Sequence, residues 1–231
     1  MLMSGTGNHE AGIGQQRVVP EFLGHHGYEG HIVDRVATIP ERLALEGYHT
    51  YMAGKWHLGS EQGVNFPGDR GFERSFALTP GNYDHFDPML GEIRYSEDGQ
   101  SIDKLPENFY STTAYVDKMI GYLQSNEGDG QPFFAWFAPT APHWPLQVLP
   151  GWKDKFVGVY DAGYDEICAL RQQGAQEAGV LPVGADTSIC PEETVPWSEL
   201  SEDDQKMNSR VMELYAGMVA HLDSEFGRLL D

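Results

Sequence analysis

A lysine and a histidine stand two residues apart between glycines in the segment GYHTYMAGKWHLG, residues 47–59. In an extended strand, residues i and i+2 project from the same face, so we expect Lys55 and His57 to point together while Trp56 turns into the protein. A lysine ammonium suits a tetrahedral oxyanion, and an imidazole donates to an anion or moves a proton near neutral pH. The pattern indicates a site for a sulfate or phosphate ester. The alternative is a surface strand end with ordinary polar residues.

A second candidate for chemistry is His143, in the segment APHWPLQ. It follows an apolar stretch at 133–137 and is bracketed by Pro142 and Pro145. Proline fixes φ and limits the freedom of a loop, and ligands of open α/β sheets bind at the carboxyl edge where such a loop begins. An ordinary solvated loop histidine is the alternative. The histidines at 9, 25, 26 and 31 are assigned no metal.

The elements that would position these side chains follow from hydrophobic periodicity. Helices are predicted over 35–45, 112–123 and about 203–230, and strands over 48–53 and 133–137. A continuous apolar strand between helices fits a buried parallel sheet. The last helix is expected to pack on a core through one apolar stripe, made of Met207, Val211, Leu214, Met218, Leu222 and Phe226.

The pattern favours one layered domain over 1–231. Two turn-rich, acidic stretches, about 81–108 and 151–197, are expected to form the rim of a cleft, and a domain linker is the competing interpretation of the second. Cys168 and Cys190 lie in that second stretch, where they either pair in an oxidising compartment or stay free thiols. Their spacing does not match a zinc site.

Composition limits the partners of this chain. Its 231 residues are 40% hydrophobic, and 35 acidic against 15 basic side chains give a net charge of −20, which argues against nucleic acid and anionic membranes. An anionic substrate would need a local positive cluster, for which Lys55 and the histidines are the candidates. No apolar run approaches the roughly 20 residues of a membrane helix. The compartment stays open among periplasmic, extracellular and cytoplasmic.

Four segments resemble the sulfatase family and follow in the family's order. They are IPERLALEGYHTYMAGKWHLG at 39–59, GFERSFALTPGNYDHFDP at 71–88, FFAWFAPTAPHWPLQ at 133–147 and YAGMVAHLDSEFGRLL at 215–230. The opening MLMSGTGNHEAGIG is similar to the run that follows the nucleophile motif in arylsulfatases. The resemblance spans nearly the whole chain. It implies an α/β fold like that of alkaline phosphatase, with a mostly parallel sheet sandwiched by helices and incomplete at both ends of this chain.

The resemblance also implies a mechanism. In sulfatases a formylglycine, made from the Cys or Ser of a Cys/Ser-x-Pro/Ala-x-Arg motif, attacks sulfur while a divalent metal, of calcium type, neutralises ester oxygens. By this resemblance Lys55 binds a sulfate oxygen and the formylglycine region, and His57 hydrogen-bonds the formylglycine diol. His143 contacts the sulfate and protonates the leaving oxygen. The expected catalytic residues are therefore Lys55, His57 and His143, of which Lys55 and His143 also bind substrate.

The sequence departs from the family pattern in three places. It contains no Cys/Ser-x-Pro/Ala-x-Arg motif, no Asp-Asp pair ending a first strand and no Asp-Asn pair after the last helix. A hard divalent cation needs several oxygen ligands, which a lysine and two histidines cannot supply. We therefore expect the metal ligands to be absent from this chain, the chain to be an internal piece of a catalytic domain, and the piece to be inactive by itself.

The favoured function is that of an arylsulfatase-like hydrolase that cleaves sulfate monoesters of small molecules or carbohydrates. The segments NHEAGIG and DHFDP resemble bacterial arylsulfatases, but the sequence does not separate aryl from sugar substrates. Two alternatives are a related phosphoester or phosphonate hydrolase and a non-catalytic remnant that binds sulfate esters.

Overall fold

The computed structural model describes most of the chain. The described residues are 1–15, 19–22, 24–60, 62–86, 94–185 and 194–231. They form two compact units, each described by itself: Met1–Pro145 with Leu222–Asp231, and Leu146–His221. The stretch 151–197 that the sequence analysis expects to shape a cleft rim lies inside the second unit, with residues 186–193 outside the described part of the chain.

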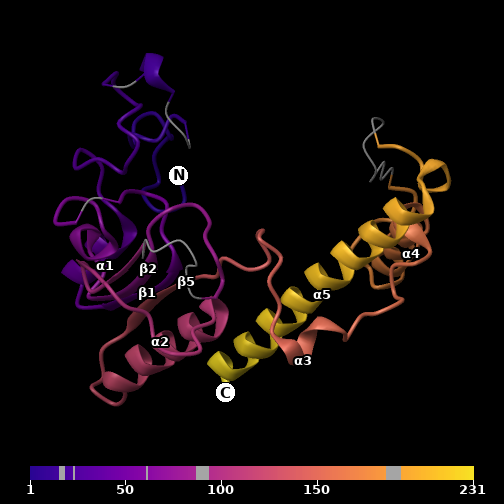
Figure 1. Cartoon of the computed structure of the whole chain (residues 1–231). Coiled ribbons are helices and arrows are strands. Elements are labelled where there is room, and N and C mark those ends of the chain that lie inside the picture. The colour runs from indigo at the N-terminus through magenta and orange to yellow at the C-terminus, as the bar shows by residue number, and fades with distance from the viewer. Residues whose placement is uncertain (16–18, 23, 61, 87–93, 186–193) are drawn as a thin grey trace. The chain divides into compact units, whose positions relative to one another are not determined.

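A five-stranded sheet forms the centre of the first unit (Figure 1). Its strands are β1 (His49–Lys55), β2 (Arg74–Leu78), β3 (Tyr95–Glu97), β4 (Gln100–Ser101) and β5 (Phe133–Ala138), in the spatial order β4-β3-β2-β1-β5. β1 runs parallel to both β2 and β5, while β3 is antiparallel to β2 and β4 is antiparallel to β3. The predicted strands at 48–53 and 133–137 are confirmed as β1 and β5. β3 and β4 fall in the expected rim stretch 81–108, of which residues 87–93 lie outside the description.

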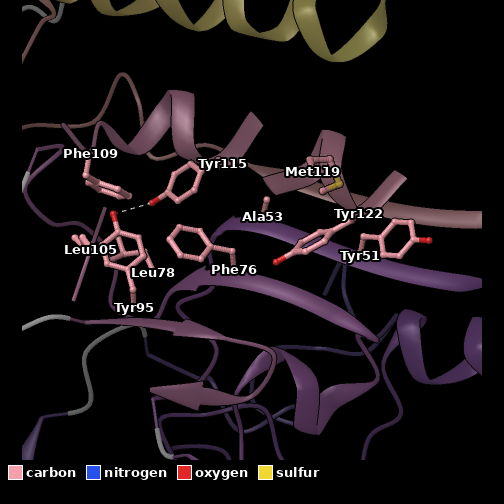
Figure 2. Close-up of a cluster of buried hydrophobic side chains, with 10 residues drawn as sticks. All are labelled: Tyr51, Ala53, Phe76, Leu78, Tyr95, Leu105, Phe109, Tyr115, Met119 and Tyr122. Carbon is pink, nitrogen blue, oxygen red and sulfur yellow. Dashed lines mark hydrogen bonds between the residues drawn. The ribbon is translucent and has the colours of Figure 1, made fainter. Parts of the chain in front are cut away.

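One face of the sheet packs against helix α2 (Ser111–Ser125), which confirms the helix predicted over 112–123. Tyr51 and Ala53 of β1 point to this face, together with Phe76 of β2. Figure 2 shows these side chains meeting Tyr115 and others from α2. Because side chains alternate along a strand, Met52 points to the opposite face, into a second core.

The second core lies under the amino-terminal segment and beside helix α1 (Ile39–Leu45). It joins Met52 and Ala77 of the sheet to apolar residues of the first 36 positions, which are Met3, Ala11, Ile32, Val33 and Val36.

A short turn η1 (Pro20–Phe22) precedes α1, and η2 (Pro67–Arg70) precedes β2. Thr38 caps α1, since its side chain accepts from Glu41 N–H while the Glu41 carboxylate accepts from Thr38 N–H. The predicted helix at 35–45 is confirmed, but it begins four residues later.

Strand β5 is less buried than its sequence predicts. Phe133 is 56% exposed, and the remaining residues of the strand are half-buried. β5 is the last strand in the sheet order, so among the described residues only β1 pairs with it. The prediction of a strand buried on both sides is therefore wrong for this chain, although the parallel pairing is confirmed.

The second unit contains α3 (Pro150–Lys153), α4 (Gly163–Glu177), η3 (Trp197–Glu199) and most of α5 (Glu202–Leu230). The predicted long helix is confirmed, and its predicted apolar stripe is buried at Met218 but exposed at Met207, Val211 and Phe226. Met207 is 59% exposed and Val211 43%, whereas Ser209 and Glu213 are buried. The Glu213 carboxylate accepts hydrogen bonds from Gly158 N–H and Arg210, both at 2.8 Å, and these bonds stabilise a polar buried face.

Two further expectations concern the cysteines and membrane-spanning helices. Cys168 lies on α4, and Cys190 is outside the described part of the chain, so pairing and two free thiols both stay predictions. Across the described residues, none of the helices is both long enough and apolar enough to cross a membrane.

Arg70 is a buried cation that ties three parts of the first unit together. Its side chain is 2% exposed and donates to the Glu41 carboxylate at 2.8 Å, to Ile32 O at 2.7 Å and to Val36 O at 2.8 Å. Burial by itself raises the pKa of Glu41, but the hydrogen bonds from Arg70 and Thr38 outweigh it and hold that pKa below its ordinary value. The ion pair thus joins α1 to the amino-terminal segment and to η2.

Replacing Arg70 is expected to destabilise the chain strongly. Arg70→Ala leaves the Glu41 carboxylate and two carbonyl groups without a donor, so the free energy of unfolding should fall by about 3–5 kcal/mol. Arg42→Ala on the exposed side of α1 is the matched control and should change it by less than about 0.5 kcal/mol. Urea denaturation of both variants measures the difference, and equal losses would show that the network does not stabilise the fold.

His49 connects three segments at the other end of β1. Its Nδ1 lies 2.6 Å from Glu73 Oε2, just before β2, and its Nε2 lies 2.8 Å from Asp129 Oδ2, in the turn between α2 and β5. These two carboxylates, Glu73 first, raise the pKa of His49 above its ordinary value of 6.5. The charged imidazole therefore holds the amino ends of β1, β2 and β5 together.

This clamp predicts a pH dependence of stability. A group whose pKa is raised by folding contributes stability that is fully present below its unfolded pKa and lost as pH rises through its folded pKa. The free energy of unfolding of the wild type, minus that of His49→Asn, should therefore shrink as pH rises from about 6.5, the ordinary histidine value. Urea midpoints at a series of pH values measure this difference, and a flat difference would rule out the clamp.

Candidate active site

Lys55 is the last residue of β1 and stands where β1 and β5 approach each other closely. The preceding Gly54 has φ of 125°, and a Cβ at this position would lie 2.0 Å from Ala138 O. Only glycine fits such an approach. Lys55, Ala138 and Pro139 line one cavity of about 300 Å³, in which Lys55 is the one charged side chain among the described lining residues.

His57 does not continue the strand. β1 ends at Lys55, and His57 has φ of 52°, in the left-handed region, with its N–H donating to Thr79 O at 3.1 Å. Trp56 is 4% exposed and donates from Nε1 to Asn65 O at 2.8 Å, so it turns inward as expected. The prediction that a strand repeat aims Lys55 and His57 from one face is wrong, because the backbone leaves the extended conformation between them.

The charge of Lys55 nevertheless acts on His57. Burial lowers the pKa of His57, and the positive charge of Lys55 lowers it further. The ring also packs tightly on Gly81, where an added Cβ would lie 2.6 Å from His57 Cε1. His57 is therefore held as a neutral imidazole at neutral pH. It lines a second cavity, of about 480 Å³, together with Thr79, Arg94 and Tyr95.

His143 lies in the loop that follows β5, the strand that neighbours β1. Gly54 pairs with Ala138 in the parallel ladder, so the loop that carries His143 begins beside Lys55. His143 is exposed, and its Nδ1 lies 2.8 Å from Trp144 O. A carbonyl oxygen only accepts, so Nδ1 carries the proton in this contact.

His85 is a buried residue beside this site to which the sequence analysis assigns no role. It is fully buried, with Nε2 3.0 Å from His143 O and Nδ1 2.8 Å from Ser111 Oγ. His85 belongs to the segment at 71–88, which resembles the sulfatase family, and residues 87 and 88 lie outside the described part of the chain. An aromatic-flanked histidine is the signal that the sequence offered, but its partners are 26 and 58 residues away along the chain.

The site thus gathers one cation and imidazoles at the carboxyl ends of two adjacent parallel strands. This arrangement can bind an oxyanion and exchange protons with it. It does not fit a metal ion, since no group of three His, Cys, Asp or Glu side chains among the described residues could hold one. The expectation that metal ligands are absent from the chain as a whole stays a prediction.

Comparisons with known proteins agree on one family. A family model described as Sulfatase matches residues 1–231. The arylsulfatase of Klebsiella aerogenes is 38% identical over 240 residues, which cover 100% of this chain and 50% of that protein. An uncharacterized sulfatase of Schizosaccharomyces pombe is 39% identical over 249 residues, which cover 100% of this chain and 44% of that protein. The chain spans about half the length of these curated relatives.

Solved structures show the same fold at lower identity. Ps i-CgsB in complex with k-i-k-neocarrahexaose superimposes with a TM-score of 0.61 at 20% identity, covering 99% of this chain and 42% of that one. BT4656 in complex with its substrate D-glucosamine-2-N,6-O-disulfate gives a TM-score of 0.59 at 20% identity, covering 99% of this chain and 50% of that one. The predicted α/β fold, a sheet flanked by helices, is confirmed.

The proximity of Lys55 and His57 can be tested by titration. Lys55→Met removes the cation and keeps the length of the side chain, so the pKa of His57 should rise while burial still holds it below its ordinary value. NMR of labelled histidine follows each imidazole as pH changes. Lys104→Met, at an exposed position of the same unit, is the matched control and should leave the His57 titration unchanged. An unaltered His57 pKa in Lys55→Met would show that the charge of Lys55 does not act on His57.

Proposed function

The chain belongs to the sulfatase family, and we propose that it forms the Lys55, His57 and His143 side of a site that hydrolyses sulfate monoesters. The observation that carries this proposal is the placement of Lys55 and His57 at the end of β1, next to the β5 loop that bears His143. The match over the whole chain supports it.

Lys55 is proposed to bind the sulfate group. Lys55 lines a cavity whose other described side chains are apolar, and a charge interacts more strongly in such surroundings than it does in water. This local charge offsets the repulsion that a net charge of −20 exerts on an anionic ester. The same cation favours the extra negative charge that develops on the sulfuryl oxygens in the transition state.

The two histidines are proposed to divide the proton transfers. His57 is held neutral by its lowered pKa, so it can accept a hydrogen bond or a proton from a hydroxyl at neutral pH. His143 is exposed, and when its ring carries a proton on both nitrogens, Nε2–H can donate a proton to the oxygen that leaves sulfur when the S–O bond breaks. The leaving oxygen departs as an alcohol while the attacking oxygen forms the new bond to sulfur, and water then releases the sulfate that Lys55 binds.

The nucleophile and the metal come from other residues in this proposal. The sulfatase family uses a divalent metal ion, and we assign a calcium-type ion and a formylglycine nucleophile to the complete catalytic domain. The printed sequence contains no Cys/Ser-x-Pro/Ala-x-Arg motif. When bound, the metal supplies charge neutralisation at the ester oxygens, while the residues of this chain bind and orient the sulfate and move protons.

The alcohol part of the ester is proposed to occupy the cavity beside His57. Its volume of about 480 Å³ is that of a small-molecule site, and its described lining contains no carboxylate. Arg94 and Ser101 add polar groups to the wall, which supports a hydroxylated or anionic leaving group. Both aryl and carbohydrate esters remain within this proposal, since the relatives include an arylsulfatase and the solved structures hold sugars.

The test is sulfate release by the natural polypeptide that carries residues 1–231, at the length its gene encodes. An aryl sulfate should be hydrolysed faster than the matching aryl phosphate. Lys55→Ala should lower kcat/KM by about 10²- to 10³-fold, the cost of removing one group that stabilises developing charge. Lys104→Ala is the matched control and should leave turnover unchanged, and the isolated 231 residues should not turn over at all.

Three outcomes would contradict the proposal. Preferred hydrolysis of the phosphate would favour the phosphoester alternative. Binding of the sulfate ester without release of sulfate would favour a non-catalytic binding protein. Wild-type activity in Lys55→Ala would remove that residue from the site.

A further inference from the structure

His85 is a fully buried histidine that the proposed mechanism does not use. It lies after β2, with both ring nitrogens in contact with other segments of the first unit. Nε2 lies 3.0 Å from the carbonyl oxygen of His143, and Nδ1 lies 2.8 Å from Ser111 Oγ at the start of α2. A buried polar ring needs such partners, because leaving it without hydrogen bonds costs free energy.

These partners determine where the ring carries its proton. The carbonyl of His143 can only accept, so Nε2 of His85 is the donor. Nδ1 of the neutral ring is then the acceptor, and the hydroxyl of Ser111 donates to it. Burial lowers the pKa of His85 and outweighs the hydrogen bond to the His143 carbonyl and the charge of Asp84, both of which raise it. The ring is accordingly a neutral imidazole in one tautomer.

A second contact fixes the same loop from the same helix. The hydroxyls of Tyr115 in α2 and Thr140 lie 3.1 Å apart, and His143 N–H donates to Thr140 O at 3.0 Å. The backbone also joins His85 to α2, since Ser111 N–H donates to His85 O at 2.7 Å. α2 thus reaches the loop through Ser111 and His85 at one point and through Tyr115 at another.

We propose that His85 is a positioning residue that fixes the backbone of His143 and so the direction of the His143 imidazole. This inference rests on the proposed function of His143 as the group that protonates the leaving oxygen. A carbonyl held at His143 restricts the peptide that follows its Cα, and the Cα–Cβ bond then points one way from an otherwise exposed loop. Without the bond, the imidazole would sample several directions, and few of them would suit proton transfer.

The first test needs no activity and no variant. In the 231-residue chain labelled with ¹⁵N-histidine, His85 should show the Nε2–H tautomer without titrating between about pH 8 and about pH 6, the range in which an ordinary histidine becomes charged. A His85 that carries its proton on Nδ1, or that titrates like a solvated histidine, would overturn the inference.

The second test compares two replacements of His85. His85→Gln places an amide N–H near the position of Nε2, and His85→Leu fills similar space without a donor. The NMR signals of the His143 imidazole should shift and broaden in His85→Leu and stay near the wild type in His85→Gln. His26→Leu, at an exposed position, is the control and should leave them unchanged. Unchanged His143 signals in a folded His85→Leu chain would overturn the inference, and Ser111→Ala, which removes only the hydroxyl bonded to Nδ1, replaces that variant if it does not fold.

The third test separates positioning from stability in the natural polypeptide. His85→Leu should lower kcat by about 10²-fold, as a misplacement of about 1 Å can do, while KM stays near the wild-type value and His85→Gln restores most of kcat. A rise in KM with an unchanged kcat in His85→Leu would contradict a positioning role. If the wild type shows no sulfatase turnover while the NMR result holds, the proposed function fails and the His85 contact to His143 stands.

Discussion

The close approach of β1 and β5 at their carboxyl ends is the constraint on which the candidate site depends. Gly54 leaves no room for a side chain against Ala138 O, where a Cβ would lie at 2.0 Å. Because the two strands run parallel, the loops that follow them begin at the same edge of the sheet. Lys55 ends one strand there, and the loop with His143 begins at the end of the other. The packing of these two backbones therefore places the candidate residues at one edge of the sheet.

Buried polar groups also hold the segments near this edge of the sheet in place. Arg70 fastens the amino-terminal segment that lies near the His57 cavity, and His85 and Tyr115 fasten the loop of His143. Each of these groups is satisfied by partners on other segments, so its desolvation is offset only in the folded arrangement. Such networks specify one geometry more strongly than apolar contacts do. The hydrophobic cores hold the sheet, and the polar anchors position the loops.

The sequence predicted the periodic elements and the chemically distinctive residues, because both depend on local information. β1, β5, α2 and α5 are confirmed, and Lys55, His57 and His143 come from short motifs. The left-handed backbone at His57 was missed, since strand alternation gives no sign of where a strand ends. His85 was missed because burial and its two partners depend on packing between distant segments. The burial of Glu213 on α5 was missed, because its hydrogen bond from Gly158 N–H joins residues that lie 55 positions apart along the chain.

Electrostatics explains why a lysine and an uncharged histidine suit this edge of a strongly acidic chain. A second fixed cation beside Lys55 would repel it, and burial already disfavours charge on His57. In the proposed function, Lys55 attracts the anion, while the imidazole of His57 serves as a proton acceptor. His143 differs because it is exposed, whereas His57 is half-buried. In the proposed function this difference in burial separates an acceptor from a donor of the same side-chain type.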